Sequence, residues 1–298
     1  MNKDTIIIGK SNLNIKRKSV KKVSVICIII NFVLLILKCI IGIISNSQAM
    51  IADSLHSFED MISSIISLIG IKISTKKYDS EHPFGYGKAE YIFSIVISML
   101  MLIAAISMIK TSIINIINLS KINFNIGLVL VCIINIILKT ALYLYTTKEL
   151  RKTGNILIKA SKEDQRNDIL ITISILVSSI FSMFGIYVID YILGVVISIW
   201  FGMVGFNIFR ISYNILIDTN VSEDRVNEIK KKVLLFDNVK SVDKVIGKPI
   251  GDRYVIILKI AMEKSMDIYK SHDIQSKIKN MLLMYDYIHD VIIHVNPY

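Results

Sequence analysis

Long apolar runs alternate with short polar segments over the first two-thirds of this chain. A helix of about 20 apolar residues crosses the hydrocarbon core of a bilayer, and six runs reach that length. They lie at 23–44, 48–71, 90–110, 125–147, 165–185 and 187–210. The first run is too long and begins too late to be a cleaved signal peptide. The pattern predicts an α-helical membrane protein with six transmembrane helices, forming a domain over 23–211.

The pattern changes after the sixth run. Helical periodicity at 222–235 and 267–284 alternates with β-rich stretches near 239–246, 254–262 and 287–295, and a Lys-Pro-Ile-Gly-Asp turn separates the first two strands. An αββαβ order predicts a small, ferredoxin-like α+β domain with both helices on one side of the sheet. We expect this domain to span 212–298.

Charge sets the expected topology. The formal net charge is +11, and the basic residues gather before the first run and in the links after the second and fourth runs. Basic residues mark the cytoplasmic side, so both termini, the C-terminal domain and a basic tail at 1–22 are expected in the cytoplasm. We expect the tail to be disordered or to lie on the lipid bilayer surface. The C-terminal domain is nearly balanced in charge, which argues against nucleic acid as a partner.

Ionisable residues inside two of the apolar runs are the candidate chemistry. Asp53, His56 and Asp60 fall within about 60° of one another on a helix, and Asp164 and Asp168 lie four residues apart on another. Charged groups at membrane depth are costly, so such clusters indicate function. One nitrogen and several oxygens suit a divalent cation such as Zn²⁺, Mn²⁺ or Fe²⁺. The alternative is hydrogen bonding between helices, but facing carboxylates would repel one another without a cation. Asp53 is either a supporting residue or a solvated interfacial carboxylate.

Other polar residues have weaker interpretations. Asp79 and His82, in the link between the second and third runs, could hold a second metal, and a solvated loop is an equal alternative. No role follows from the sequence for four polar residues inside the first and fourth runs, which are Asn31, Lys38, Asn135 and Lys139.

Three stretches together resemble the signatures of the cation diffusion facilitator family. They are A-D-S-L-H-S-F-E-D at 52–60, H-P-F-G-Y-G-K-A-E at 82–90 and D-Q-R-N-D at 164–168. The resemblance implies a homodimer that exports divalent metal from the cytoplasm in exchange for protons, by alternating access. By position, it implies that His56, Asp60, Asp164 and Asp168 form the transport site in each protomer.

The resemblance also implies sites outside the membrane. Asp79 and His82 match two ligands of a loop site, but Tyr86 stands where the family has a third, histidine ligand. His272 and His294 resemble ligands of a metal site that the family often has between protomers in the cytoplasmic domain, and a weak site or none is expected here.

Other positions depart from that pattern or have a different role. Lys259 and Asn296 replace a histidine and a carboxylate expected at the cytoplasmic site, and an ammonium group cannot ligate a metal. This domain is therefore expected to serve mainly as a dimer contact, and His272 alone is equally consistent with an exposed helical histidine. Lys88 and Asp218 resemble an ion pair near the dimer axis, and the alternative for both is snorkelling at the membrane interface.

The sequence favours a proton-coupled exporter in the plasma membrane over two rivals, a membrane metal sensor and a passive cation channel. A channel should show a continuous polar stripe or a carbonyl-rich filter, whereas the polar residues gather in one cluster. No nucleophile–base pair or phosphate loop favours an enzyme. Asp164 in place of a second histidine hardens the site towards Mn²⁺ or Fe²⁺, while His56 favours Zn²⁺. The metal is therefore open within that group.

Overall fold

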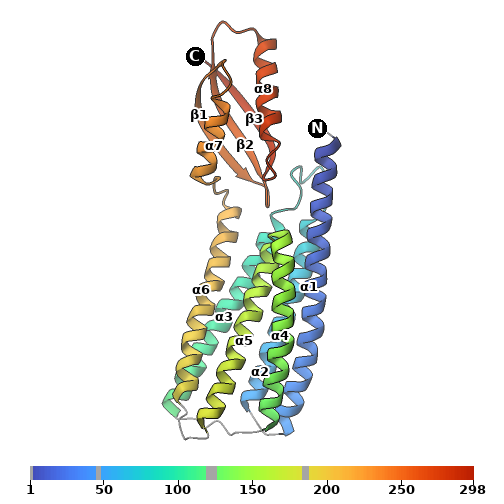
Figure 1. The fold of residues 1–298 in the computed structure, drawn as a ribbon, viewed down its shortest axis with the longest axis vertical. Helices are drawn as coiled ribbons and strands as arrows, with labels where there is room; N and C mark the ends of the chain where they lie inside the picture. Colours follow the sequence, from blue (N-terminus) through green and yellow to red (C-terminus); the bar gives the residue numbers. More distant parts are fainter. Residues whose placement is uncertain (1–2, 45–47, 119–125, 183–187) are drawn as a thin grey trace. The chain divides into compact units, whose positions relative to one another are not determined.

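The computed structural model describes residues 3–44, 48–118, 126–182 and 188–298 (Figure 1). The chain divides into two compact units, one made of residues 1–76 and 89–212, the other of residues 77–88 and 213–298. Helices α1 to α6 belong to the first unit, α6 running on into the second, and their bounds are Lys3–Ile44, Gln48–Ser74, Ala89–Asn118, Ile126–Thr153, Ile156–Ser182 and Val188–Leu216.

Two predicted boundaries need correction. Helix α1 begins at Lys3, so the described part of the basic tail is a continuation of the first helix and not a disordered segment. Helix α5 begins at Ile156 rather than near residue 165, so much of the basic link before it is helical. In both places the helix extends into a polar segment, and the prediction missed this part because it relied on apolar runs alone.

The six-helix unit buries many polar side chains and exposes many large apolar ones. The buried side chains of α2 recur at helical spacing and are mostly polar, namely Ser54, Ser57, Asp60, Ser64 and Ser67. Large apolar side chains face outward, including Phe58 and Ile65 on α2 and Leu144 on α4. This arrangement suits a solvent of lipid, where apolar groups can face outward and polar groups must find partners within the protein.

Four of the helices are long and apolar enough to cross a membrane when the described residues are considered. Their candidate spans are Ile15–Ile41, Ala89–Ile114, Val129–Thr153 and Val195–Leu216. They make the first unit a helical membrane domain. Helices α2 and α5, which carry the clustered ionisable residues, are not among these four spans.

A two-residue turn joins α4 to α5. Gly154 has a positive φ of 59°, which an L side chain rarely adopts, and its N–H donates to the Leu150 carbonyl at 2.8 Å. The Asn155 side chain then accepts hydrogen bonds from the N–H groups of Leu157 and Ile158, which caps α5. Because the turn is short, α4 and α5 run antiparallel and remain neighbours along their length.

The C-terminal unit has the predicted αββαβ order. Its elements are α7 (Glu223–Val233), β1 (Val239–Pro249), β2 (Tyr254–Met262), α8 (Ile268–Leu282) and β3 (Ile288–Pro297). Strand β2 is central, antiparallel to β1 and parallel to β3. Alternate β2 residues such as Ile256 and Leu258 share one core with Ile229 of α7 and Ile278 of α8, so both helices cover the same face.

The loop at 77–88 groups with the C-terminal unit, although the sequence assigned it to the membrane domain. A Cβ on Gly87 would lie 2.8 Å from the Ile250 carbonyl oxygen, so only glycine permits this close approach. Lys88 adds an ion pair to Asp218. These contacts are long-range in the chain, which is why hydrophobic patterning did not reveal them.

Candidate functional site

Lys139 lies at the centre of the candidate site. Its ammonium group contacts Asp60 Oδ2 on α2 at 2.6 Å and Asp168 Oδ2 on α5 at 2.8 Å. The three side chains are only 1%, 3% and 1% exposed, respectively. Asp60 and Asp168, two of the four residues predicted for the transport site, therefore both contact the ammonium group of Lys139 on α4.

The α4–α5 turn explains why these side chains meet. Lys139 and Asp168 are nearly equally far from Gly154 along the chain, and on antiparallel helices they reach the same depth, roughly 20 Å from the turn. One helical turn further on, the Asn135 amide donates to the Thr172 hydroxyl at 2.6 Å. The two contacts together fix the register of α4 against α5.

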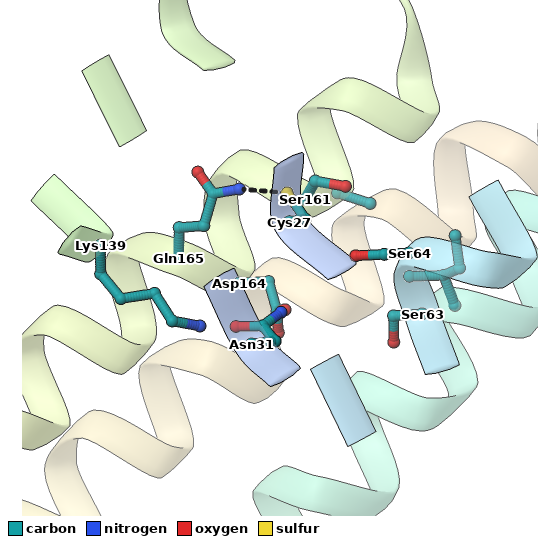
Figure 2. Close-up of a pocket in the computed structure, with 10 residues that line it drawn as sticks. Cys27, Asn31, Ser63, Ser64, Lys139, Ser161, Asp164 and Gln165 are labelled. Atoms are coloured by element: carbon teal, nitrogen blue, oxygen red, sulfur yellow. Dashed lines mark hydrogen bonds between the residues drawn. The ribbon is translucent and has the colours of Figure 1, made fainter. Parts of the chain in front are cut away.

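Asp164 is half-buried and lines two cavities in the membrane domain. One, of about 10 Å³, has polar walls that include Asn31, Lys139 and Gln165 (Figure 2). The other, of about 70 Å³, is more apolar and lies among α2, α3, α5 and α6. Asp164 is therefore more exposed than Asp60 and Asp168, which lie beside Lys139, and Asp60 also lines the larger cavity.

The histidine of the predicted transport site cannot be placed. His56 lies on α2, but its side chain and that of Asp53 are outside the described residues. Among the side chains that the structure describes, no three His, Cys, Asp or Glu groups gather as a metal site would require. The four-ligand set therefore stays a prediction.

The repulsion argument made from the sequence needs correction. Facing carboxylates do need a cation, but Lys139 supplies one from within the chain. Sequence reasoning left Lys139 without a role, although a signal was present: a lysine in the middle of an apolar helix must find a carboxylate partner. Lys38 is a second fully buried lysine, and it donates a hydrogen bond to the Ser57 hydroxyl at 3.1 Å.

Helices α1, α4 and α5 are joined by further buried polar contacts. The Ser19 hydroxyl donates to Glu149 at 2.5 Å, and the Gln165 amide donates to the Cys27 sulfur at 3.2 Å. Glu90, the last residue of the signature 82–90, accepts from the N–H of Ile156 at 3.3 Å, which ties α3 to the start of α5.

The loop residues Asp79 and His82 do come together. The His82 Nδ1 atom lies 3.3 Å from Asp79 Oδ1, and the backbone N–H of His82 donates to the same oxygen at 2.7 Å. Tyr86 donates its hydroxyl to Asp79 Oδ2 at 2.6 Å, and this bond holds the pKa of Asp79 below its ordinary value. Tyr86 therefore reaches Asp79 but offers a hydrogen-bond donor where a metal would need a ligand.

The two histidines of the predicted cytoplasmic site do not converge within one chain. His294 is exposed on the face of β3 that α7 and α8 leave open, while His272 is exposed on α8, which covers the opposite face. His294 pairs in register with Lys259, so a cation lies beside it. Asn296 donates to Asp243 at 3.1 Å and is engaged within the sheet.

The predicted ion pair between Lys88 and Asp218 is present. Their charged atoms lie 2.5 Å apart, and Lys248 approaches the same carboxylate at 3.8 Å. The hydrogen bond from Lys88 lowers the pKa of Asp218 below its ordinary value. Asp218 also has a positive φ of 60°, so the pair holds a left-handed backbone conformation in the segment after α6.

Comparison with known proteins covers nearly the whole chain. A family model described as the cation efflux transmembrane domain matches residues 24–217, and one described as the cytoplasmic domain of cation efflux proteins matches residues 221–298. The manganese efflux system protein MneP of Bacillus subtilis is 26% identical over 286 residues, covering 93% of this chain and 96% of the relative. An uncharacterised transporter of Methanocaldococcus jannaschii is 28% identical, covering 94% and 99%. The magnetosome protein MamB of Magnetospira sp. is 23% identical, covering 87% and 89%.

Proposed function

The chain belongs to the cation diffusion facilitator family, and from that premise we propose that it exports divalent metal cations from the cytoplasm in exchange for protons. The observation that carries the proposal is that the carboxylates of Asp60 and Asp168, from two different helices, meet at the ammonium group of Lys139 in the buried centre of the helix bundle. Ionisable residues within transmembrane segments are rare, pair with one another and mark ion pathways.

The transport site of the proposal consists of His56, Asp60, Asp164 and Asp168. Helices α2 and α5 each contribute a pair of these residues spaced one turn apart, which allows four donors to surround one ion. Asp164 borders the polar cavity and the larger one, so it is the most accessible of the three carboxylates in the proposed site. Metal binding displaces protons from such ligands, and protons returning from the other side favour release.

The proposal includes six spanning helices, both termini in the cytoplasm, and a plasma-membrane location. The basic residues of the α4–α5 region and the tail support this orientation. It also includes a homodimer, supported by the match of the C-terminal unit to the cytoplasmic domain of cation efflux proteins. The four-donor set, with a single imidazole, fits Mn²⁺, Fe²⁺ and Zn²⁺, and one relative is named as a manganese efflux protein.

Reconstituted vesicles with an imposed pH gradient test the proposal. Saturable Mn²⁺ or Zn²⁺ flux that follows the proton gradient is expected, and Asp168→Ala should abolish it while the protein still purifies as a folded species. Asp237→Ala, in an exposed turn, is the matched control that should retain full flux. Flux that ignores the gradient would indicate a channel, and binding without flux would indicate a sensor. The same assay with Fe²⁺, Co²⁺ and Cd²⁺ ranks the ions.

A further inference from the structure

Lys139 occupies the place that the proposed function gives to a metal. Its ammonium group touches two carboxylates that come from different helices, and all three groups are at least 97% buried. Each of these buried charges needs a partner of opposite sign, and like charges repel, so a divalent cation cannot share these oxygens with an ammonium group at contact distance. The lysine and the metal therefore exclude each other.

We propose that Lys139 is a tethered competitor of the transported metal, which holds Asp60 and Asp168 in the metal-free protein and withdraws when the ion binds. This inference rests on the proposed function and adds a residue that the four-ligand set does not contain. It assigns Lys139 a positioning role: the lysine neutralises the vacated ligands and lowers the affinity to a level from which the ion can leave.

The walls of the polar cavity provide a place for the withdrawn ammonium group. Asn31 Oδ1 is a buried acceptor that has no hydrogen-bond partner among the described residues, and its side chain lines the cavity that Lys139 also lines (Figure 2). Buried acceptors are normally paired, so an unpaired one at this cavity indicates a donor that arrives in another state.

The size of the cavity suits this movement. Its volume of about 10 Å³ admits roughly one water-sized group, and an ammonium group is about that size. The lysine stem is long and has several rotatable bonds, so its end can move from the carboxylates to the cavity while the backbone of α4 stays in place. Ser63, Ser64 and Ser161 complete the polar lining.

Metal binding by the detergent-purified full chain tests the proposal, with Mn²⁺ and Zn²⁺ as the probes. Removing the competitor in Lys139→Gln should lower the Kd by about tenfold or more, which is 1.4 kcal/mol or more. Lys139→Arg keeps the charge and should restore weak binding. In flux assays Lys139→Gln should lower both KM and the maximal rate, because the ion leaves more slowly. An unchanged or higher Kd in Lys139→Gln would overturn the proposal.

Asn31→Leu tests the same idea without touching the ion pair. It removes one acceptor and fills the cavity, so it should raise the Kd several-fold while Asp60 and Asp168 remain intact. This variant keeps the proposal falsifiable should Lys139→Gln fail to fold, and an unchanged Kd in Asn31→Leu would then overturn it.

The Asp60→Asn variant distinguishes failure of the competitor proposal for Lys139 from failure of the proposed transport site. Metal binding by the wild type that disappears in Asp60→Asn supports the site, and a Lys139→Gln variant that fails to tighten it defeats the competitor alone. Wild-type binding that is absent or independent of Asp60 defeats both the competitor and the proposed transport site.

Discussion

Replacing Lys139 by methionine should be among the most destabilising single changes in the membrane domain. The substitution leaves Asp60 and Asp168 buried without their cation, since the ammonium group lies 2.6 and 2.8 Å from their oxygens and is 1% exposed. Breaking a buried pair by removing one partner costs about 3–5 kcal/mol. At roughly 2–4 °C per kcal/mol for a domain of this size, the Tm should fall by about 6–20 °C.

The fluorescence of the single tryptophan can follow this unfolding. Trp200 on α6 lies 4.1 Å from the guanidinium of Arg166 on α5, so its emission reports packing within the helix bundle. Lys277→Met is the matched control, because its ion pair with Asp273 is equally short at 2.7 Å but about 60% exposed. Surface pairs contribute about 0–1 kcal/mol, so the control should melt close to the wild type.

A triple variant completes the test. Combining Lys139→Met with Asp60→Asn and Asp168→Asn removes all three charges and should recover most of the lost stability, because neutral groups of similar size fill the site. A Lys139→Met protein that melts within a degree or two of the wild type would refute the reasoning. So would a triple variant as unstable as the single one, since the loss would then come from packing and not from unpaired charge.

Three further predictions concern other parts of the fold. Gly154→Ala should cost about 1–2 kcal/mol, measured as a lower Tm, because φ is +59° there while no neighbour lies within 4 Å; a stabilised variant would contradict this. Leu258→Ala should destabilise the C-terminal unit by about 2–5 kcal/mol in denaturant titrations, because Leu258 is fully buried; a loss below 1 kcal/mol would show a core that readily closes the gap. Lys88→Gln should raise the pKa of Asp218, measured by NMR. The ion pair stabilises the fold at pH values above the ordinary carboxyl pKa of about 4 and loses this effect as the pH falls through the lowered pKa of Asp218. The variant should therefore be less stable than the wild type by at most about 1 kcal/mol at neutral pH and equally stable in acid. A difference in stability that does not change with pH would exclude the ion pair as its cause.

The strands and helices of the C-terminal unit were predictable because their patterns are local. Strand β2 was expected at 254–262 and is Tyr254–Met262, and its alternation of core residues is a direct consequence of the pleat. The start of α5 was missed because Lys159 and Lys162 interrupt the apolar run. The loop at 77–88 joins the second unit through a close approach between Gly87 and Ile250, which no local pattern encodes.

The site was predictable in part for a similar reason. Asp60 and Asp168 were selected because each belongs to a pair of ionisable residues on one helical face, and the structure brings both to the same atom. Lys139 was missed because no second charged residue lies one turn away from it on the same face of α4. Its partners lie on α2 and α5, and only the register of the α4–α5 hairpin places them at its depth.

The short connection between α4 and α5 also distinguishes the two contacts of Lys139 from each other. With only Gly154 and Asn155 between the helices, and with Asn135 bonded to Thr172, Lys139 and Asp168 are held at matching depths of one hairpin. Asp60 lies on α2, which is outside that hairpin. The contact with Asp168 is therefore internal to the α4–α5 hairpin, whereas the contact with Asp60 fastens the hairpin to α2.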